Sequence, residues 1–264
     1  MNASWRRACG LTDADGATPW AAWQLRQEGR DPQHEACAWI TPCHWRVATD
    51  HVTMAHPRQL ELDAEESQAL LAAMQPFFQH DGIALEYDAP TRWLARGEVF
   101  RDLATASLDR VVGRTIDEWM PRAPQARLLR RLQQEMQMLL YTHEINEARG
   151  RTGLLPVNSF WVSGTGALAP SAAAAAPAGL RLPHYLRDAA LNDDWNGWAS
   201  AWQQLDAKDC ARLAADLDAG RDVTLTLCGE RRAQSWSSSG SSPWSRRLRS
   251  VFTRPRARAV LESL

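Results

Sequence analysis

The chain has 264 residues, of which 45% are hydrophobic and 23% charged, and a formal net charge of −1 at pH 7. These values are those of an ordinary globular protein with one large domain or two small ones. A membrane-spanning protein is excluded, because no stretch approaches the roughly 18 consecutive apolar residues that a span needs. Residues 1–7 also lack the apolar stretch of a signal peptide. We therefore predict a soluble, cytoplasmic protein without a transmembrane segment.

The five cysteines are an odd number and include no Cys-x-x-Cys pair. We therefore expect buried thiols and neither disulfides nor a zinc site. The 13 tryptophans are a high count. Most of them should anchor the core or an interface, because a tryptophan ring buries a large apolar area and needs one partner for its N–H group.

The first part of the chain is predicted to begin as a loop and to continue as strands. Residues 1–35 form a loop-rich N-terminal segment, with turn signals around a short helix near residues 20–27. Strand-like stretches follow at residues 36–41 and 45–54.

A helix followed by a hairpin is predicted next. Asp63, with Glu66 three residues later, resembles a capping box that opens this helix. Apolar residues at a spacing of about 3.6 give the helix one apolar face, and Gly82 ends it. The alternating residues at 83–87 and the stretch 92–94 then predict two strands.

The most regular helical pattern covers residues 123–142. A turn and a short apolar strand at residues 157–162 follow it. The Gly-Thr-Gly sequence at 164–166 is predicted to be a tight turn after that strand, since it lacks the full motif of a phosphate-binding loop. Residues 36–166 are therefore predicted to form the main α/β domain, a mixed sheet with flanking helices.

The chain beyond the main domain is predicted to contain a linker and a further helical region. Residues 167–180 are rich in alanine and are predicted to be the linker. Two helices at about 194–205 and 207–219 and a strand at 223–228 belong to a C-terminal region, residues 181–236. We expect this region to pack on the main domain.

Residues 237–264 are predicted to be a disordered basic tail. Serine and glycine at 237–242 cannot bury enough apolar surface to offset the entropy of ordering. Six arginines and one glutamate follow from residue 243 onward. The apolar residues among them, spaced four, three and one apart, are Trp244, Leu248, Val251 and Phe252. This narrow stripe could lie on an anionic membrane or on nucleic acid, and a solvated arginine-rich terminus is the alternative.

Cys43, His44, His51 and His56 lie close together in sequence, but their spacings fit no zinc pattern, and a strand would place them on both of its faces. Asp50 and His51 resemble the dyads of binuclear metalloenzymes, which need further ligands that no second cluster supplies. We therefore predict neither a metal site nor a cofactor. These side chains are expected to be satisfied polar groups.

A more distinctive polar stripe lies at the end of the longest predicted helix. His143, Asn146 and Arg149 recur every three residues and would share one helix face, where they could meet an anion or an acidic partner. Alternatively, they cap backbone carbonyls and brace the following loop. In either case we predict that they lie close to that loop, with Asn158 bonded to backbone and Trp161 buried.

Nine positions in and after this stripe follow one pattern, namely His143, Asn146, Arg149, Gly153, Pro156, Asn158, Trp161, Gly164 and Gly166. The pattern resembles the second lobe of archaeal-type cofactor-independent phosphoglycerate mutases, over about residues 37–166. Stretches at 106–114, 137–143, 157–161 and 225–231 are also similar to a group of bacterial RpfE-type regulatory proteins. The resemblance implies part of the α/β fold that phosphoglycerate mutases share with alkaline phosphatases.

The departures from the mutases bear on catalysis. Those enzymes open with a strand that ends in an Asp-Gly metal site and carry a phosphorylatable serine soon after, and this chain begins beyond that point. The arginine-rich stretch that would hold phosphate is replaced by residues 51–58, and a late strand ends in Gly-Glu-Arg at 229–231 where Asp-His is expected. Because phosphoryl transfer depends on positioned cations, we expect no working enzyme.

The resemblance thus implies a regulatory pseudoenzyme that binds a small anion or a protein partner. The candidate contact residues are Arg92, Asp109, Arg110, His143, Asn146, Arg149 and Asn158. The alternative is a metal-dependent phosphoglycerate mutase or phosphatase whose catalytic lobe is missing from the start of this chain. If active, the protein would be a phosphoglycerate mutase-like isomerase.

Overall fold

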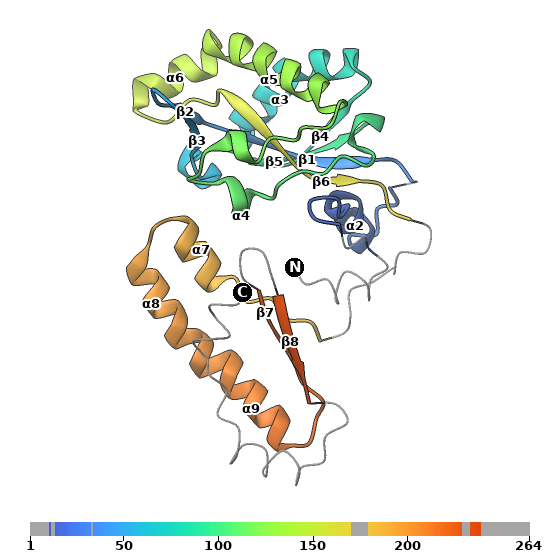
Figure 1. The fold of residues 1–264 in the computed structure, drawn as a ribbon. Coiled ribbons are helices and arrows are strands. Elements are labelled where there is room, and N and C mark those ends of the chain that lie inside the picture. The colour runs from blue at the N-terminus through green and yellow to red at the C-terminus, as the bar shows by residue number, and fades with distance from the viewer. Residues whose placement is uncertain (1–10, 12–13, 33, 170–178, 229–232, 239–264) are drawn as a thin grey trace. The chain divides into compact units, whose positions relative to one another are not determined.

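The computed structural model describes residues 11, 14–32, 34–169, 179–228 and 233–238. These residues belong to two compact units that divide at residue 179. We call the described part before this residue the main unit and the part from it onward the C-terminal unit. Both units contain helices and strands (Figure 1), which confirms the predicted α/β class.

A four-stranded sheet forms the centre of the main unit, in the order β4-β5-β1-β6. Its strands are β1 (Cys37–Cys43), β4 (Ala84–Ala89), β5 (Arg92–Arg96) and β6 (Ser159–Gly166). Every neighbouring pair is antiparallel, so the predicted mixed sheet is wrong in that respect. The reason is that β4 and β5 form a hairpin, while β6 runs opposite to β1. β1 is buried along its whole length.

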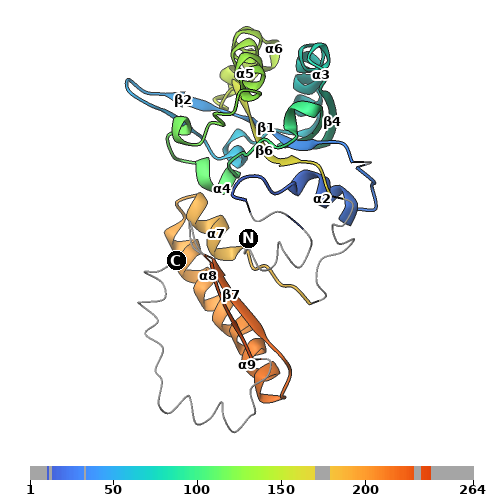
Figure 2. The ribbon, with the colours of Figure 1, turned by 45° about the vertical axis from the view of Figure 1, so that its right-hand side comes forward.

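Two helices, α3 (Ala64–His80) and α5 (Ala126–Tyr141), cover one face of this sheet (Figures 1 and 2). Both are predicted from the apolar periodicity. Asp63 opens α3 as expected, because its side chain accepts a hydrogen bond from the N–H group of Glu66 at 2.8 Å. The helices and the sheet share one core, in which the rings of Phe78 and Phe160 lie 5.1 Å apart.

The opposite face of the sheet is covered in part by α2 (Trp20–Gln27), at the predicted place (Figures 1 and 2). The remaining elements of the main unit are β2 (Trp45–Val47), β3 (Val52–Met54), α4 (Leu108–Val111), α6 (Glu144–Thr152) and the 3-10 turns η1 (Pro57–Leu60), η2 (Glu98–Phe100) and η3 (Ile116–Glu118). β2 and β3 pair as a hairpin, whereas the sequence predicts one strand-like stretch at residues 45–54. The N–H group of Ala48 closes the hairpin by donating to the carbonyl oxygen of His51 at 2.9 Å.

Gly164 and Gly166 lie inside strand β6. The sequence predicts them to form a turn after the strand at residues 157–162. β6 continues through Gly164 and Gly166 and stays beside β1. Gly164 has a φ of +64°, and a Cβ atom there would lie 3.1 Å from Cβ of Trp20 and 3.2 Å from the nitrogen of Ala21. A side chain would push α2 away from the sheet, so glycine is needed for this close approach.

The C-terminal unit consists of helices and a hairpin. Its elements are α7 (Tyr185–Leu191), α8 (Trp195–Gln204), the π-helical turn η4 (Leu205–Cys210), α9 (Ala211–Asp218), β7 (Thr224–Cys228) and β8 (Ala233–Ser237). One continuous helix is formed by α8, η4 and α9 (Figure 1), whereas the sequence predicts two helices. The residues between the two predicted helices form a π-helical turn, so the helix is not interrupted. β8 is a strand that the sequence reading misses, and its last residue falls within the predicted tail.

The predicted linker and tail lie largely outside the described residues, at 170–178 and 239–264. The packing of residues 181–236 on the main domain stays a prediction. Of the helices that the structure describes, none is both long enough and apolar enough to span a membrane.

The four described cysteines have two different environments. Cys37 and Cys43 are buried on β1, as expected, whereas Cys210 and Cys228 are exposed free thiols, so the prediction of buried thiols is wrong for these two. Burial raises the pKa of the Cys37 thiol to about 11, although Arg96 acts in the opposite direction. Burial raises the pKa of Cys43 as well. The thiols on β1 therefore stay protonated at neutral pH and serve as small core side chains.

Candidate functional site

The predicted polar stripe lies on a separate short helix, α6. The sequence pattern predicts it instead at the end of the preceding helix. α5 ends at Tyr141, and the extended backbone of His143 interrupts the helix. Nδ1 of His143 accepts a hydrogen bond from the N–H group of Ile145 at 3.3 Å. His143 therefore acts as the N-cap of α6.

Asn146 joins two segments of backbone. Its Nδ2 donates to the carbonyl oxygens of Leu140, at 2.8 Å, and of Val157, at 2.6 Å. Its Oδ1 accepts a hydrogen bond from the N–H group of Val157 at 2.9 Å. This buried side chain thus holds the end of α5 against the segment that leads into β6.

Arg149 has a side chain that is 0% exposed. Its Nε donates to the carbonyl oxygen of Leu155 at 2.9 Å. One terminal nitrogen donates to the carboxylate of Glu66 at 2.5 Å, and the other donates to the carbonyl oxygen of Leu60. A buried charge is tolerated only when it is paired and hydrogen-bonded, and these partners come from three parts of the chain.

The side chains of Asn158 and Trp161 form hydrogen bonds with the backbone of Trp45 and Ala106. Oδ1 of Asn158 accepts from the N–H group of Trp45 at 2.7 Å, and its Nδ2 donates to the Trp45 carbonyl oxygen at 2.9 Å. Trp161 is 1% exposed, and its Nε1 donates to the carbonyl oxygen of Ala106 at 2.9 Å. The predicted backbone bonding of Asn158 and burial of Trp161 are confirmed.

Arg92 lies at the start of β5, apart from the α6 group. Its Nε donates to Asp88 at 2.6 Å. Its guanidinium also lies over the Trp39 ring, 4.7 Å from the ring centroid. The side chain is 40% exposed, so its charge reaches solvent but already has a carboxylate and an aromatic face as partners.

Asp109 and Arg110 lie on α4, with Asp109 in its first turn. Arg110 donates to Asp15 at 2.7 Å and lies over the Trp119 ring, 5.8 Å from its centroid. The structure thus brings His143 and its neighbours together around the start of β6 and places the other three candidates elsewhere. Whether any of the seven contacts a ligand stays a prediction.

The histidines near β2 and β3 each have a partner. Nδ1 of His44 lies 2.8 Å from the carbonyl oxygen of Pro156, and burial lowers the pKa of His44. His51 lies 2.5 Å from Asp50. Nδ1 of His56 accepts a backbone N–H group at 3.1 Å and caps η1. Among the residues that the structure describes, no three His, Cys, Asp or Glu side chains gather as a metal ion would require.

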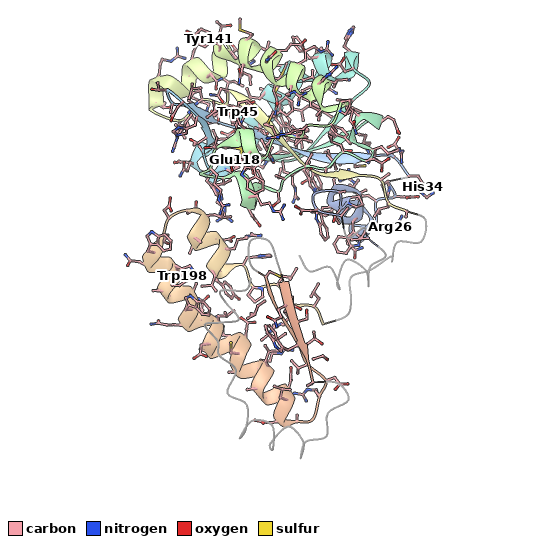
Figure 3. The ribbon with its side chains drawn as sticks, in the orientation of Figure 1. Arg26, His34, Trp45, Glu118, Tyr141 and Trp198 are labelled. Atoms are coloured by element: carbon pink, nitrogen blue, oxygen red, sulfur yellow. The ribbon has the colours of Figure 1, made fainter. Side chains whose placement is uncertain are left out.

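A second feature, which the sequence reading does not single out, is a row of three tryptophans on α8. Trp195, Trp198 and Trp202 are spaced three and four residues apart and so share one face. The rings of Trp195 and Trp198 meet edge to face at 6.3 Å, and those of Trp198 and Trp202 at 5.7 Å. We call this row the tryptophan face; Figure 3 labels its central residue. The spacing is a sequence signal that could have identified it.

The tryptophan face is exposed at both of its ends, and Trp198 between them is half-buried. Trp195 is 64% exposed and Trp202 is 45% exposed. Ala201 is the one buried residue among those of 179–238 whose burial is described. Contiguous exposed apolar surface on a globular unit marks an interaction site, and edge-to-face contacts hold the rings in fixed orientations. This face is therefore suited to bind another apolar surface.

These observations define an α/β protein with a polar group that braces its own backbone and an exposed aromatic face. No family model matches the chain, and no curated protein matches it. A solved structure to which it is similar is the cofactor-independent phosphoglycerate mutase from Thermoplasma acidophilum DSM 1728, with a TM-score of 0.41 and 16% sequence identity over 56% of this chain. The match covers 41% of that protein, so the chain spans about two fifths of its length. The structural relationship is distant and extends over about half of the chain.

Proposed function

We propose that this chain is a phosphoglycerate mutase-like regulatory protein of the RpfE type, which acts by binding a protein partner and not by phosphoryl transfer. The observation that carries the proposal is the exposure of the tryptophan face, 64% at Trp195 and 45% at Trp202. Tryptophan is among the residues that contribute most to the binding energy of protein interfaces.

The contacts of Arg149 favour a protein partner over a small anion. Its guanidinium is fully buried, and its nitrogens already donate to a carboxylate and two carbonyl oxygens of the chain. A phosphate group would have to displace these bonds and would leave Glu66 without its cation, at a high cost in free energy. The polar stripe therefore fits the alternative role, that of bracing the loop before β6.

Partner binding is tested by placing p-benzoylphenylalanine, a photo-crosslinking residue, at Trp202 of the full chain in its native cells. We expect one discrete adduct with another protein, because this position lies within the proposed interface. The identified partner, once purified, should bind a Trp202→Asp variant at least about tenfold more weakly.

The matched control is the same photo-crosslinking residue at Gln204. This exposed position lies roughly 160° around α8 from Trp202, so it should give no such adduct. Adducts of equal yield at both positions, or none at either, would contradict partner binding through the tryptophan face.

Catalysis is tested separately with the purified chain. We expect no interconversion of 2- and 3-phosphoglycerate, because Arg149, the cation of the mutase-like pattern, binds groups of the chain itself. We also expect no stoichiometric manganese or zinc, because no three His, Cys, Asp or Glu side chains gather among the described residues. A coupled assay with added manganese and a metal analysis give the readouts, against a mock preparation. Chelator-sensitive turnover above the mock would refute the proposal in favour of the metal-dependent mutase or phosphatase.

A further inference from the structure

We propose that the basic segment at residues 243–252 binds to the tryptophan face of its own chain and so competes with the protein partner. This rests on the proposed function, since it assigns an internal competitor to the same face. The segment belongs to residues 239–264, which lie outside the described structure, and its sequence is known.

The surface that would receive the segment is longer than the tryptophan face itself. A π-turn takes in one residue more than an α-helical turn. Allowing for this extra residue, Leu217 lies roughly 40° around the helix from Trp202, on the same side. Leu217 is 39% exposed. The apolar strip from Trp202 to Leu217 is about 22 Å long at the rise of an α-helix.

The charge of the C-terminal unit favours a basic occupant. Residues 179–228 contain eight aspartates against four arginines and one lysine. Asp206 is exposed one turn after Trp202. A guanidinium group beside the strip would pair with the exposed carboxylate of Asp206, whereas a second copy of the unit would add further negative charge.

The segment at 243–252 carries both features that this surface requires. Its sequence is Pro-Trp-Ser-Arg-Arg-Leu-Arg-Ser-Val-Phe. At helical spacing its four large apolar residues fall in one stripe. Arg247 and Arg249 lie on either side of that stripe, and Arg246 lies on the opposite face. An apolar stripe with an arginine on each side complements an apolar strip that carries the exposed carboxylate of Asp206.

The segment also begins within reach of the strip. The N–H group of Ser238 donates to the carbonyl oxygen of Val223 at 2.9 Å, and Oγ of Ser238 accepts from the N–H group of Val223 at 2.8 Å. The chain therefore leaves β8 at the hairpin end that joins α9, and the hairpin runs alongside the long helix (Figures 1 and 2). Six extended residues span about 20 Å, and nine residues at helical rise add about 13 Å, which is enough to follow the strip from Leu217 to Trp202.

The test is photo-crosslinking of the purified full chain with p-benzoylphenylalanine at Trp202. We expect cross-links within one chain, from position 202 to residues 243–252, mapped by mass spectrometry of proteolytic peptides. The double variant Leu248→Asp, Phe252→Asp should lower their yield at least about tenfold, because it places two carboxylates on the apolar stripe.

The matched control is the double variant Ser250→Asp, Thr253→Asp. It makes the same change in charge on the opposite side of the stripe and should lower the yield by no more than about threefold. Cross-links that form only between chains, or none to residues 243–252, overturn the proposal. So does retention of the chain on phosphatidylglycerol vesicles that depends on Leu248, without an intrachain cross-link.

The same variants separate this proposal from the proposed function. In cells, the change at Leu248 and Phe252 should increase the partner adduct at position 202, because the competitor is lost. A partner adduct without any intrachain cross-link refutes the internal competitor alone. Intrachain cross-links without any partner adduct refute the proposed function alone.

Discussion

Replacing Arg149 with methionine is expected to lower the free energy of unfolding of the main unit by about 3 kcal/mol. The change leaves the carboxylate of Glu66 without its cation and the carbonyl oxygens of Leu60 and Leu155 without a donor. The Glu66 side chain is 25% exposed, so water offsets part of the cost. Native-state hydrogen exchange of the β1 amides in urea would measure the effect on the main unit by itself.

Two further substitutions serve as controls for this prediction. Arg151→Met changes an exposed arginine on the same helix and should alter the stability by no more than about 0.5 kcal/mol. Arg149→Lys should fall between the two, because lysine keeps the charge but lacks the planar fork that reaches three acceptors. If Arg149→Met folds as stably as the parent chain and instead loses binding to a phosphorylated ligand, Arg149 serves a ligand and the bracing role is wrong.

Replacing Trp161 with alanine is expected to cost about 3–5 kcal/mol. The indole is 1% exposed, so its removal leaves a cavity beside Met120 and Leu129, which line the same small hollow. The carbonyl oxygen of Ala106 also loses the N–H donor that it accepts at 2.9 Å. The urea dependence of exchange at the β1 and β6 amides again gives the measurement.

An exposed aromatic residue of the same unit provides the comparison for Trp161. Tyr141 is 85% exposed, and Tyr141→Ala should change the stability by no more than about 0.5 kcal/mol. Trp161→Phe retains much of the ring but not the N–H group, so its cost should be intermediate. Equal effects of the alanine variants at 141 and 161 would show that the indole does not support the sheet.

The polar pattern of His143, Asn146, Arg149 and Asn158 is explained in this chain by hydrogen bonds, most of them to backbone. Asn146 and Asn158 each bind a backbone N–H and a backbone carbonyl of another segment. His143 caps a helix, and Arg149 binds two carbonyl oxygens as well as a carboxylate. Together they fix how α6 and the loop after it approach β6.

Several features were determined by the sequence alone. The cap at Asp63 and the helices α3 and α5 agree with the sequence-based predictions. Helix caps and apolar periodicity depend on residues that lie within about four positions of one another. Such signals are complete in the local sequence and can be recognised without knowledge of the fold.

Only the tertiary structure decided the partners and the exposure of the functional candidates. Glu66 pairs with Arg149 across 83 positions of sequence, and no local pattern identifies that partner. The antiparallel sheet and the pairing of β8 with β7 likewise depend on which distant strands meet. The spacing of Trp195 and Trp202 predicts that they share a helix face, but their exposure depends on which segments cover that face in space. Spacing along one helix carries no information about its neighbours, so the hydrogen-bond partners of the polar stripe and the exposure of the tryptophans follow from the tertiary structure.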